Sequence, residues 1–138
     1  LVRGRASLRK AADPTPPVGS PSAALARYAE LFNARDWDAM RAMLAEDVRL
    51  DVVLRAQREG RAAGVYYTKY SEATDWARVA PGFVDGREVL GVFREGQDEP
   101  AYFIELAFDE AGRIRFIRDF RHVPYIGRDA RFVRSERA

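Results

Sequence analysis

The sequence contains no cysteine, which excludes disulfides and thiolate chemistry and makes a reducing, cytoplasmic location the natural expectation. No apolar run approaches the roughly 20 residues that a membrane span needs, and no signal-peptide pattern opens the chain. His122 is the single histidine, so we expect no metal site. The glycines lack phosphate-binding spacing, and nothing indicates a cofactor.

Basic charge is concentrated at the two ends of the chain. Residues 14–127 carry 15 basic and 18 acidic side chains, a net charge of −3, so the pI of about 9.2 comes from the ends. A strongly basic surface, the usual mark of nucleic-acid binding, is therefore not expected on the globular part. At 138 residues and 47% hydrophobic content the chain fits one domain with a core.

Composition divides the chain into four parts. Residues 1–10 form a basic leader with helical character, and three prolines in residues 11–19 predict an extended linker. The domain is expected over residues 20–127, followed by a basic flexible tail over 128–138. Because the chain opens on arginines without a methionine, we interpret it as part of a longer protein.

The first half of the domain has the apolar spacing of helices. Ser20 and Pro21 predict a helix start, followed by an apolar face of Leu25, Tyr28 and Phe32. Asp36 is expected to cap a second helix, whose apolar face consists of Trp37, Met40, Met43 and Leu44. The tyrosines within Ala62–Tyr70 predict a short third helix. They are expected to be core, with a stacking platform for a planar ligand as the alternative.

The second half reads as antiparallel strands, so the predicted fold class is α+β. An alternating run begins at Val48, and later runs are expected at Trp76–Val84, Arg87–Phe93, Ala101–Phe108 and Arg113–His122. Hairpin turns are predicted at Asp85-Gly86 and at Asp109–Gly112.

The last predicted strand places charge where a half-buried strand is normally apolar. Alternation puts Ile117, Asp119 and Arg121 on one face of the sheet. Two interpretations remain open: Asp119 and Arg121 form an internal ion pair, or the pair orients a polar ligand.

The opposite face of that sheet is expected to be apolar enough to need covering. It should present Ile114, Phe116, Arg118 and Phe120 from the last strand, with Phe103, Glu105 and Ala107 from the strand before it. We expect a C2 homodimer or docking onto another domain, with interface candidates Phe103, Glu105, Phe116, Arg118, Phe120 and His122.

Two stretches, Tyr28–Met40 and Leu44–Val48, resemble the opening of the nuclear-transport-factor-2-like (SnoaL-like) family. The resemblance covers roughly residues 22–126 and implies a cone-shaped fold, with helices packed on a strongly curved, mostly antiparallel sheet. Such folds host enzymes, binding modules and dimerisation domains.

A narrower resemblance is to the C-terminal SnoaL-like domain of extracytoplasmic-function sigma factors. The segments that carry it are Phe32–Asp36, Val48–Val52, Gly60–Ala62, Pro100–Phe103 and Ile117–Arg121. It implies that the leader is the tail of sigma region 4. It also implies a non-catalytic domain that modulates transcription initiation by contacting sigma regions and RNA polymerase.

Two alternatives remain: an enzyme, or a stand-alone small-molecule binding module. In ketosteroid isomerases the family alignment places the catalytic tyrosine at Tyr28, but it places the two acids at Val52 and Ile104, which argues against that chemistry. A SnoaL-like polyketide cyclase would use Asp119 as acid or base. The candidate pocket residues are Tyr28, Val52, Tyr102, Ile104, Ile117, Asp119 and Arg121.

Overall fold

The computed structural model describes residues 22–53, 56–122 and 132–134, which form three α-helices, a 3-10 helix and one seven-stranded sheet. The helices are α1 (Ala23–Asn33), α2 (Trp37–Ala42), η1 (Gly60–Gly64) and α3 (Val65–Glu72). The strands are β2 (Leu44–Val52), β3 (Ala56–Glu59), β4 (Arg78–Val84), β5 (Arg87–Phe93), β6 (Tyr102–Phe108), β7 (Ile114–Asp119) and β8 (Phe132–Arg134). The predicted leader and linker lie outside the described residues.

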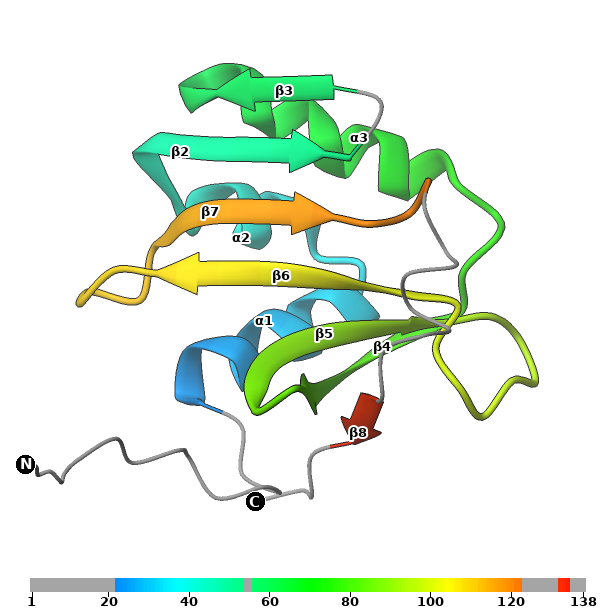
Figure 1. The fold of residues 1–138 in the computed structure, drawn as a ribbon. Coiled ribbons are helices and arrows are strands. Elements are labelled where there is room, and N and C mark those ends of the chain that lie inside the picture. Colours follow the sequence, from blue (N-terminus) through cyan, green and yellow to red (C-terminus); the bar gives the residue numbers. More distant parts are fainter. Residues whose placement is uncertain (1–21, 54–55, 123–131, 135–138) are drawn as a thin grey trace, which may run out of the picture.

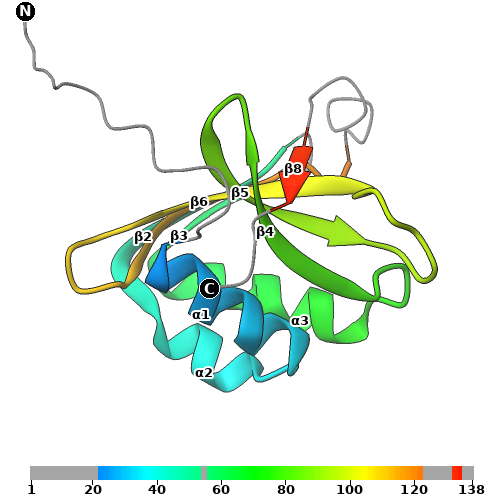
Figure 2. The same ribbon diagram turned by 90° about the horizontal axis from the view of Figure 1, so that it is seen from below.

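The sheet and the helices form two layers (Figures 1 and 2). The strand order is β3-β2-β7-β6-β5-β4-β8, and every neighbouring pair is antiparallel except β2 and β7. All three α-helices lie on one face of the curved sheet, and the main core fills the space between the layers. Among the described residues, no helix has the length and apolar character to cross a membrane.

Helix α1 begins two residues later than predicted. Its cap is Ser22, whose Oγ accepts from the Leu25 backbone N–H at 3.2 Å, and not Ser20. Leu25, Tyr28, Ala29 and Phe32 are buried at helical spacing, as predicted. The local pattern therefore identified the buried face, but two serines spaced two apart left the cap position ambiguous.

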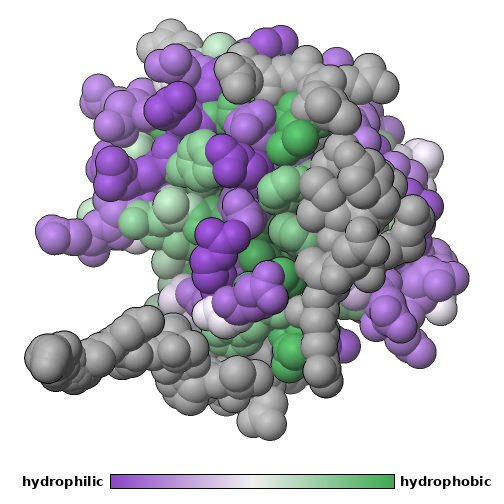
Figure 3. All heavy atoms as spheres, in the orientation of Figure 1, coloured by the Kyte–Doolittle hydropathy of each residue, from purple (hydrophilic) through white to green (hydrophobic). Residues whose placement is uncertain are grey.

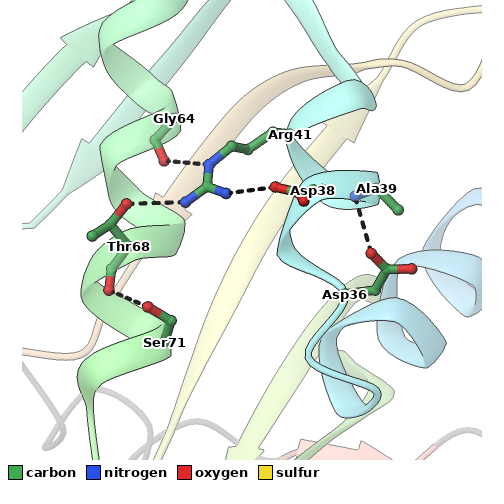
Figure 4. Close-up of polar contacts among 7 residues, drawn as sticks. All are labelled: Asp36, Asp38, Ala39, Arg41, Gly64, Thr68 and Ser71. Atoms are coloured by element: carbon green, nitrogen blue, oxygen red, sulfur yellow. Dashed lines mark hydrogen bonds and ion pairs between the residues drawn. The ribbon is translucent and has the colours of Figure 1, made fainter.

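Helix α2 is shorter than predicted because the chain enters the sheet at Leu44. Asp36 caps it as expected, accepting from the Ala39 N–H at 3.2 Å. Arg41 then joins α2 to the next helical segment, donating to the Gly64 carbonyl at 3.3 Å and to Thr68 Oγ1 at 3.0 Å (Figure 4). This contact holds the start of α3, whose tyrosines face the core.

The predicted third helix exists, with η1 and α3 covering residues 60–72. The predicted hairpins are also present. Asp85 and Gly86 both have positive φ, at 52° and 79°, as a two-residue β-turn matched to strand twist requires. In the second hairpin, Asp109 Oδ1 accepts from the backbone N–H groups of Ala111 and Arg113, both at 2.9 Å.

Ile114 lies on the opposite face from the one predicted. It is fully buried in the main core, whereas strict alternation from Phe116 would turn it outward. The pairing of β6 with β7 shifts register between Ala107 and Phe108, so Phe108 pairs with Ile114 while Ala107 pairs with Phe116. The extra residue, Arg115, reverses the alternation of side chains at this point.

Part of the predicted flexible tail forms a strand. Residues Phe132–Arg134 make β8, which pairs with β4 at the edge of the sheet. The Phe132 ring lies over Gly82 and Gly91, where an added Cβ would approach it to 2.3 Å and 2.7 Å respectively. Two glycines on adjacent strands thus form a slot for this ring, a relation between segments 40–50 residues apart that local patterns do not reveal.

Candidate functional site

The candidate site is built around Asp119, the last residue of β7. Its strand neighbours in register are Val52 on β2 and Ile104 on β6, so aliphatic residues flank it on both sides. Asp119 is 0% exposed. Among the residues that the structure describes, it is the one charged or polar residue that is buried. Strand alternation correctly predicted that it points inward.

The Asp119 carboxylate is held by hydroxyl and amide donors. The hydroxyls of Tyr66 and Tyr70 donate to its Oδ2 at 2.6 Å and 2.7 Å, and the backbone N–H of Arg121 donates to Oδ1 at 2.8 Å. Tyr70 and Tyr102 share a further hydroxyl hydrogen bond at 2.5 Å. The Tyr70 hydroxyl already donates its hydrogen bond to Asp119. In the bond between Tyr70 and Tyr102, the Tyr102 hydroxyl is therefore the donor. The result is a directed chain from Tyr102 through Tyr70 to Asp119.

Burial dominates the ionisation of this group. Desolvation raises the pKa of Asp119 above its ordinary value of 3.8, and the two tyrosine bonds, the Arg121 N–H and the Arg121 guanidinium oppose that rise. Burial, with the Asp119 charge next in order, holds the pKa values of Tyr66 and Tyr70 well above 10. The tyrosines therefore stay protonated and remain donors.

The predicted ion pair between Asp119 and Arg121 is wrong. The Arg121 guanidinium bonds to Asp75 Oδ1 at 2.6 Å, and it lies 5.1 Å from the centroid of the Tyr70 ring. None of the ion pairs among the described residues includes Asp119. Sequence proximity favoured Arg121, but its side chain turns toward the half-exposed Asp75 at the surface, where the charges remain hydrated.

Most of the predicted pocket residues lie together. Val52 and Ile104 flank Asp119 in register, Ile117 is buried one pleat away, and Tyr102 joins through Tyr70. Tyr28 instead bonds to the hydroxyl of Tyr67 at 3.0 Å, next to this network.

Sequence reasoning missed the roles of Tyr66, Tyr70 and Asp75. The tyrosines were expected in the core, and they are buried, but their hydroxyls also bind the acid. The signal was the i, i+4 spacing of Tyr66 and Tyr70, which places two hydroxyls on one helix face. Asp75 carries no comparable signal, since it lies in the connection between α3 and β4.

The interface candidates other than His122, which lies in a turn after β7, lie on the sheet face turned away from the helices, in different degrees of exposure. Phe103 is only 4% exposed because Phe120 and Phe132 pack over it. The chain itself thus covers part of the face that we expected another molecule to cover. Partly exposed members are Glu105, Phe116, Arg118 and Phe120, and His122 is exposed.

No group of three or more potential metal-ligating side chains occurs among the described residues. Clefts do occur on the surface of this part of the chain. One of about 450 Å³ is lined by Arg49, Leu50, Asp51, Arg58, Glu59, Phe116 and Arg118, on the face away from Asp119.

Tyr70→Phe tests the coupling between Asp119 and the tyrosines. Loss of one hydrogen bond that favours the ionised acid should raise the pKa of Asp119 further, and should cost about 1–3 kcal/mol of stability. The carboxyl ¹³C chemical shift of Asp119, followed by NMR against pH, measures this directly. Tyr67→Phe is the matched control, because its hydroxyl bonds to Tyr28 and not to the acid. An equal pKa in both variants would contradict the coupling.

Comparison with known proteins adds a structural result. No family model matches the chain, and no curated protein matches it. A candidate ketosteroid isomerase from Kribbella flavida superposes with a TM-score of 0.50 at 24% identity, over 71% of this chain and 74% of that one.

Two further structures match at lower TM-scores. SalBIII, an epoxide hydrolase/cyclase-like enzyme of pyran ring formation in salinomycin, gives 0.48 at 24% identity over 69% of this chain and 84% of its own. Rd1NTF2_05, described as having a long sheet, gives 0.43 at 18% identity over 66% and 87%. None of the three is described as a sigma factor. The chain therefore has the nuclear-transport-factor-2-like fold predicted from its sequence.

Proposed function

We propose that this chain is an enzyme in which Asp119 acts as a general acid toward an oxygen atom of a small organic substrate. The observation that carries the proposal is a fully buried carboxyl held by tyrosine hydroxyls with its pKa raised by desolvation. A carboxylic acid that stays protonated nearer neutrality than an exposed one can donate a proton in a reaction. The non-catalytic interpretation assumed an Arg-paired acid, and that pairing is absent.

The hydrogen-bond chain supplies a path for the proton. The tyrosines donate toward Asp119 when it is ionised, and both bonds reverse when it is protonated. The proton of Asp119 can then pass to Tyr70, that of Tyr70 to Tyr102, and that of Tyr102 to a substrate oxygen. The Tyr102 hydroxyl lies within electrostatic reach of both Arg121 and Asp75, the ion pair at the surface. We place substrate entry at this ion pair, which must open to admit the molecule.

Epoxide hydrolysis is the reaction that this arrangement fits. The proton of Asp119 reaches the ring oxygen as one carbon–oxygen bond breaks, and a water molecule forms the new bond at that carbon. The proton that the water loses returns to Asp119, so the acid is regenerated and the product is a diol. Ketosteroid isomerisation, the activity named for the Kribbella flavida protein, would instead require a base, and therefore Asp119 in its ionised form.

Asp119→Asn tests the proposal with styrene oxide as the probe and diol formation as the readout. We expect the rate to fall about a hundred- to ten-thousand-fold, as for loss of a general acid. The wild-type rate should also fall as pH rises through the pKa of Asp119, because the protonated form is required. Glu72→Gln, on the exposed end of α3, is the control. Equal rates in the wild type and Asp119→Asn would refute the role.

The regulatory role in a sigma factor remains a prediction. Its evidence lies in the leader and linker, which are outside the described residues, and in the resemblance of short segments. Deleting residues 22–138 from a parent sigma factor and measuring transcription initiation in vitro would test it.

A further inference from the structure

We propose that Arg121 binds a carboxylate group of the substrate, and that the Asp75 carboxylate occupies this place on Arg121 when no substrate is bound. The inference rests on the proposed function, because it concerns the same site and names the class of substrate. That class is small organic acids that also carry an oxygen atom for Asp119 to protonate. Neutral molecules of the same shape are poorer ligands.

Arg121 is fixed in place beside the buried acid. It lies in the turn that follows β7, and its backbone N–H donates to Asp119 Oδ1 at 2.8 Å. Its guanidinium lies 5.1 Å from the centroid of the Tyr70 ring, and the hydroxyl of the same tyrosine donates to Asp119 Oδ2 at 2.7 Å. A group bound by this guanidinium therefore lies next to the tyrosine through which the proton moves.

The contact with Asp75 indicates which kind of anion fits. Arg121 Nη2 donates to Asp75 Oδ1 at 2.6 Å, so a carboxylate already lies against the guanidinium. A guanidinium carries five N–H donors in one plane and can hold a carboxylate by two parallel hydrogen bonds. A substrate carboxylate that bonds to two of its nitrogens is held better than Asp75, which bonds through Nη2.

Asp75 can leave Arg121 without disturbing a helix or a strand. It lies in the connection between α3 and β4, and its side chain is 45% exposed. Next to it, Trp76 is buried and its Nε1–H donates to the Tyr70 carbonyl at 3.3 Å, which holds the backbone of this connection. Figure 1 shows the connection and the end of β7 on the same side of the molecule. Rotation of the Asp75 side chain is thus enough to expose Arg121 to a ligand.

Exchange of one carboxylate for another costs little free energy. An ion pair with an exposed partner contributes little to stability, because water solvates that partner again when the pair opens. The Arg121 side chain is the less exposed partner, at 22%, and a guanidinium stays charged in proteins. A neutral substrate that displaced Asp75 would leave this charge without a partner, which disfavours its binding.

Isothermal titration calorimetry with cinnamate and cinnamamide tests the proposal. The two probes share one skeleton, differ in the charge of one group, and carry no epoxide to react. The wild type should bind cinnamate about ten- to a hundredfold more tightly than cinnamamide. Arg121→Gln should lose this preference, although its backbone bond to Asp119 remains. Asp75→Asn removes the competing carboxylate, so it should bind cinnamate about two- to fivefold more tightly than the wild type, with no such gain for cinnamamide.

Arg87→Gln is the matched control. Arg87 also forms an ion pair, with Glu105 at 2.9 Å, but on the outer sheet face, where hydrophilic and hydrophobic residues both reach the surface (Figure 3). This variant should keep the wild-type preference for cinnamate. Circular dichroism of each variant confirms that it is folded, so that a loss of binding reports on the guanidinium itself.

Three results would overturn the proposal. A wild type that binds both probes equally, or binds neither, would show that no carboxylate site exists here. An Arg121→Gln variant that still prefers cinnamate would place the carboxylate elsewhere. Weaker binding of cinnamate by Asp75→Asn would show that Asp75 supports the site instead of competing for it. Failure of the proposed function is seen separately, in the rates of styrene oxide opening, because neither calorimetric probe needs a proton from Asp119.

Discussion

Phe32→Ala should lower the free energy of unfolding by about 3–5 kcal/mol, the range for deleting a buried phenylalanine side chain. Phe32 is fully buried on α1, and its ring lies 5.0–5.8 Å from four other aromatic rings, which belong to Tyr28, Trp37, Tyr70 and Trp76. The Tyr28 ring lies on α1 itself, and the other three come from α2, from α3 and from the loop before β4. The substitution leaves a cavity, and because the neighbours are rigid rings they can relax little to fill it.

Urea denaturation followed by circular dichroism measures this loss. Thermal denaturation should show the same change as a drop in Tm on the order of 15 °C. Val65→Ala is the control, since Val65 is 51% exposed and its truncation should change stability by less than about 0.5 kcal/mol. Phe32→Leu should fall between the two, because it fills part of the cavity. A Phe32→Ala variant as stable as Val65→Ala would show that this aromatic cluster is not the centre of the fold.

The second large effect concerns the pH dependence of stability. Because desolvation raises the pKa of Asp119 in the folded state, the folded protein holds this proton more tightly than the unfolded chain does. The resulting stabilisation is fully present below the ordinary value of 3.8 and is lost as pH rises through the raised pKa. Within that window, the unfolding free energy can fall by about 1.4 kcal/mol per pH unit because of this one group.

Asp119→Asn removes this ionisation. The difference in unfolding free energy between the wild type and Asp119→Asn should therefore shrink or reverse as pH increases through the window. Urea denaturation at a series of pH values from 4 upward provides the measurement. Asp98→Asn, which changes an exposed carboxylate in the loop between β5 and β6, should give a curve parallel to the wild type. If the Asp119→Asn curve is equally parallel, the buried acid titrates like an exposed one.

Local patterns predicted the elements and the faces of most side chains. Phe32 was placed in the core by helical spacing, Asp85-Gly86 was placed in a two-residue turn, and Asp119 was placed on the inner face by alternation. Each of these follows from backbone geometry within a few residues, which is the same in any protein. The prediction for Ile114 was wrong because a bulge depends on how the two strands pair.

The sequence by itself determined the α+β class, the helix and strand pattern and the inward orientation of the acid. Only the tertiary structure decided what each charged group contacts. Asp119 accepts hydrogen bonds from the hydroxyls of Tyr66 and Tyr70, which lie 53 and 49 residues earlier in the sequence. Arg121 pairs with Asp75, 46 residues earlier. Alternation assigns a side chain to a face, but the segment that packs on that face is chosen by the whole chain.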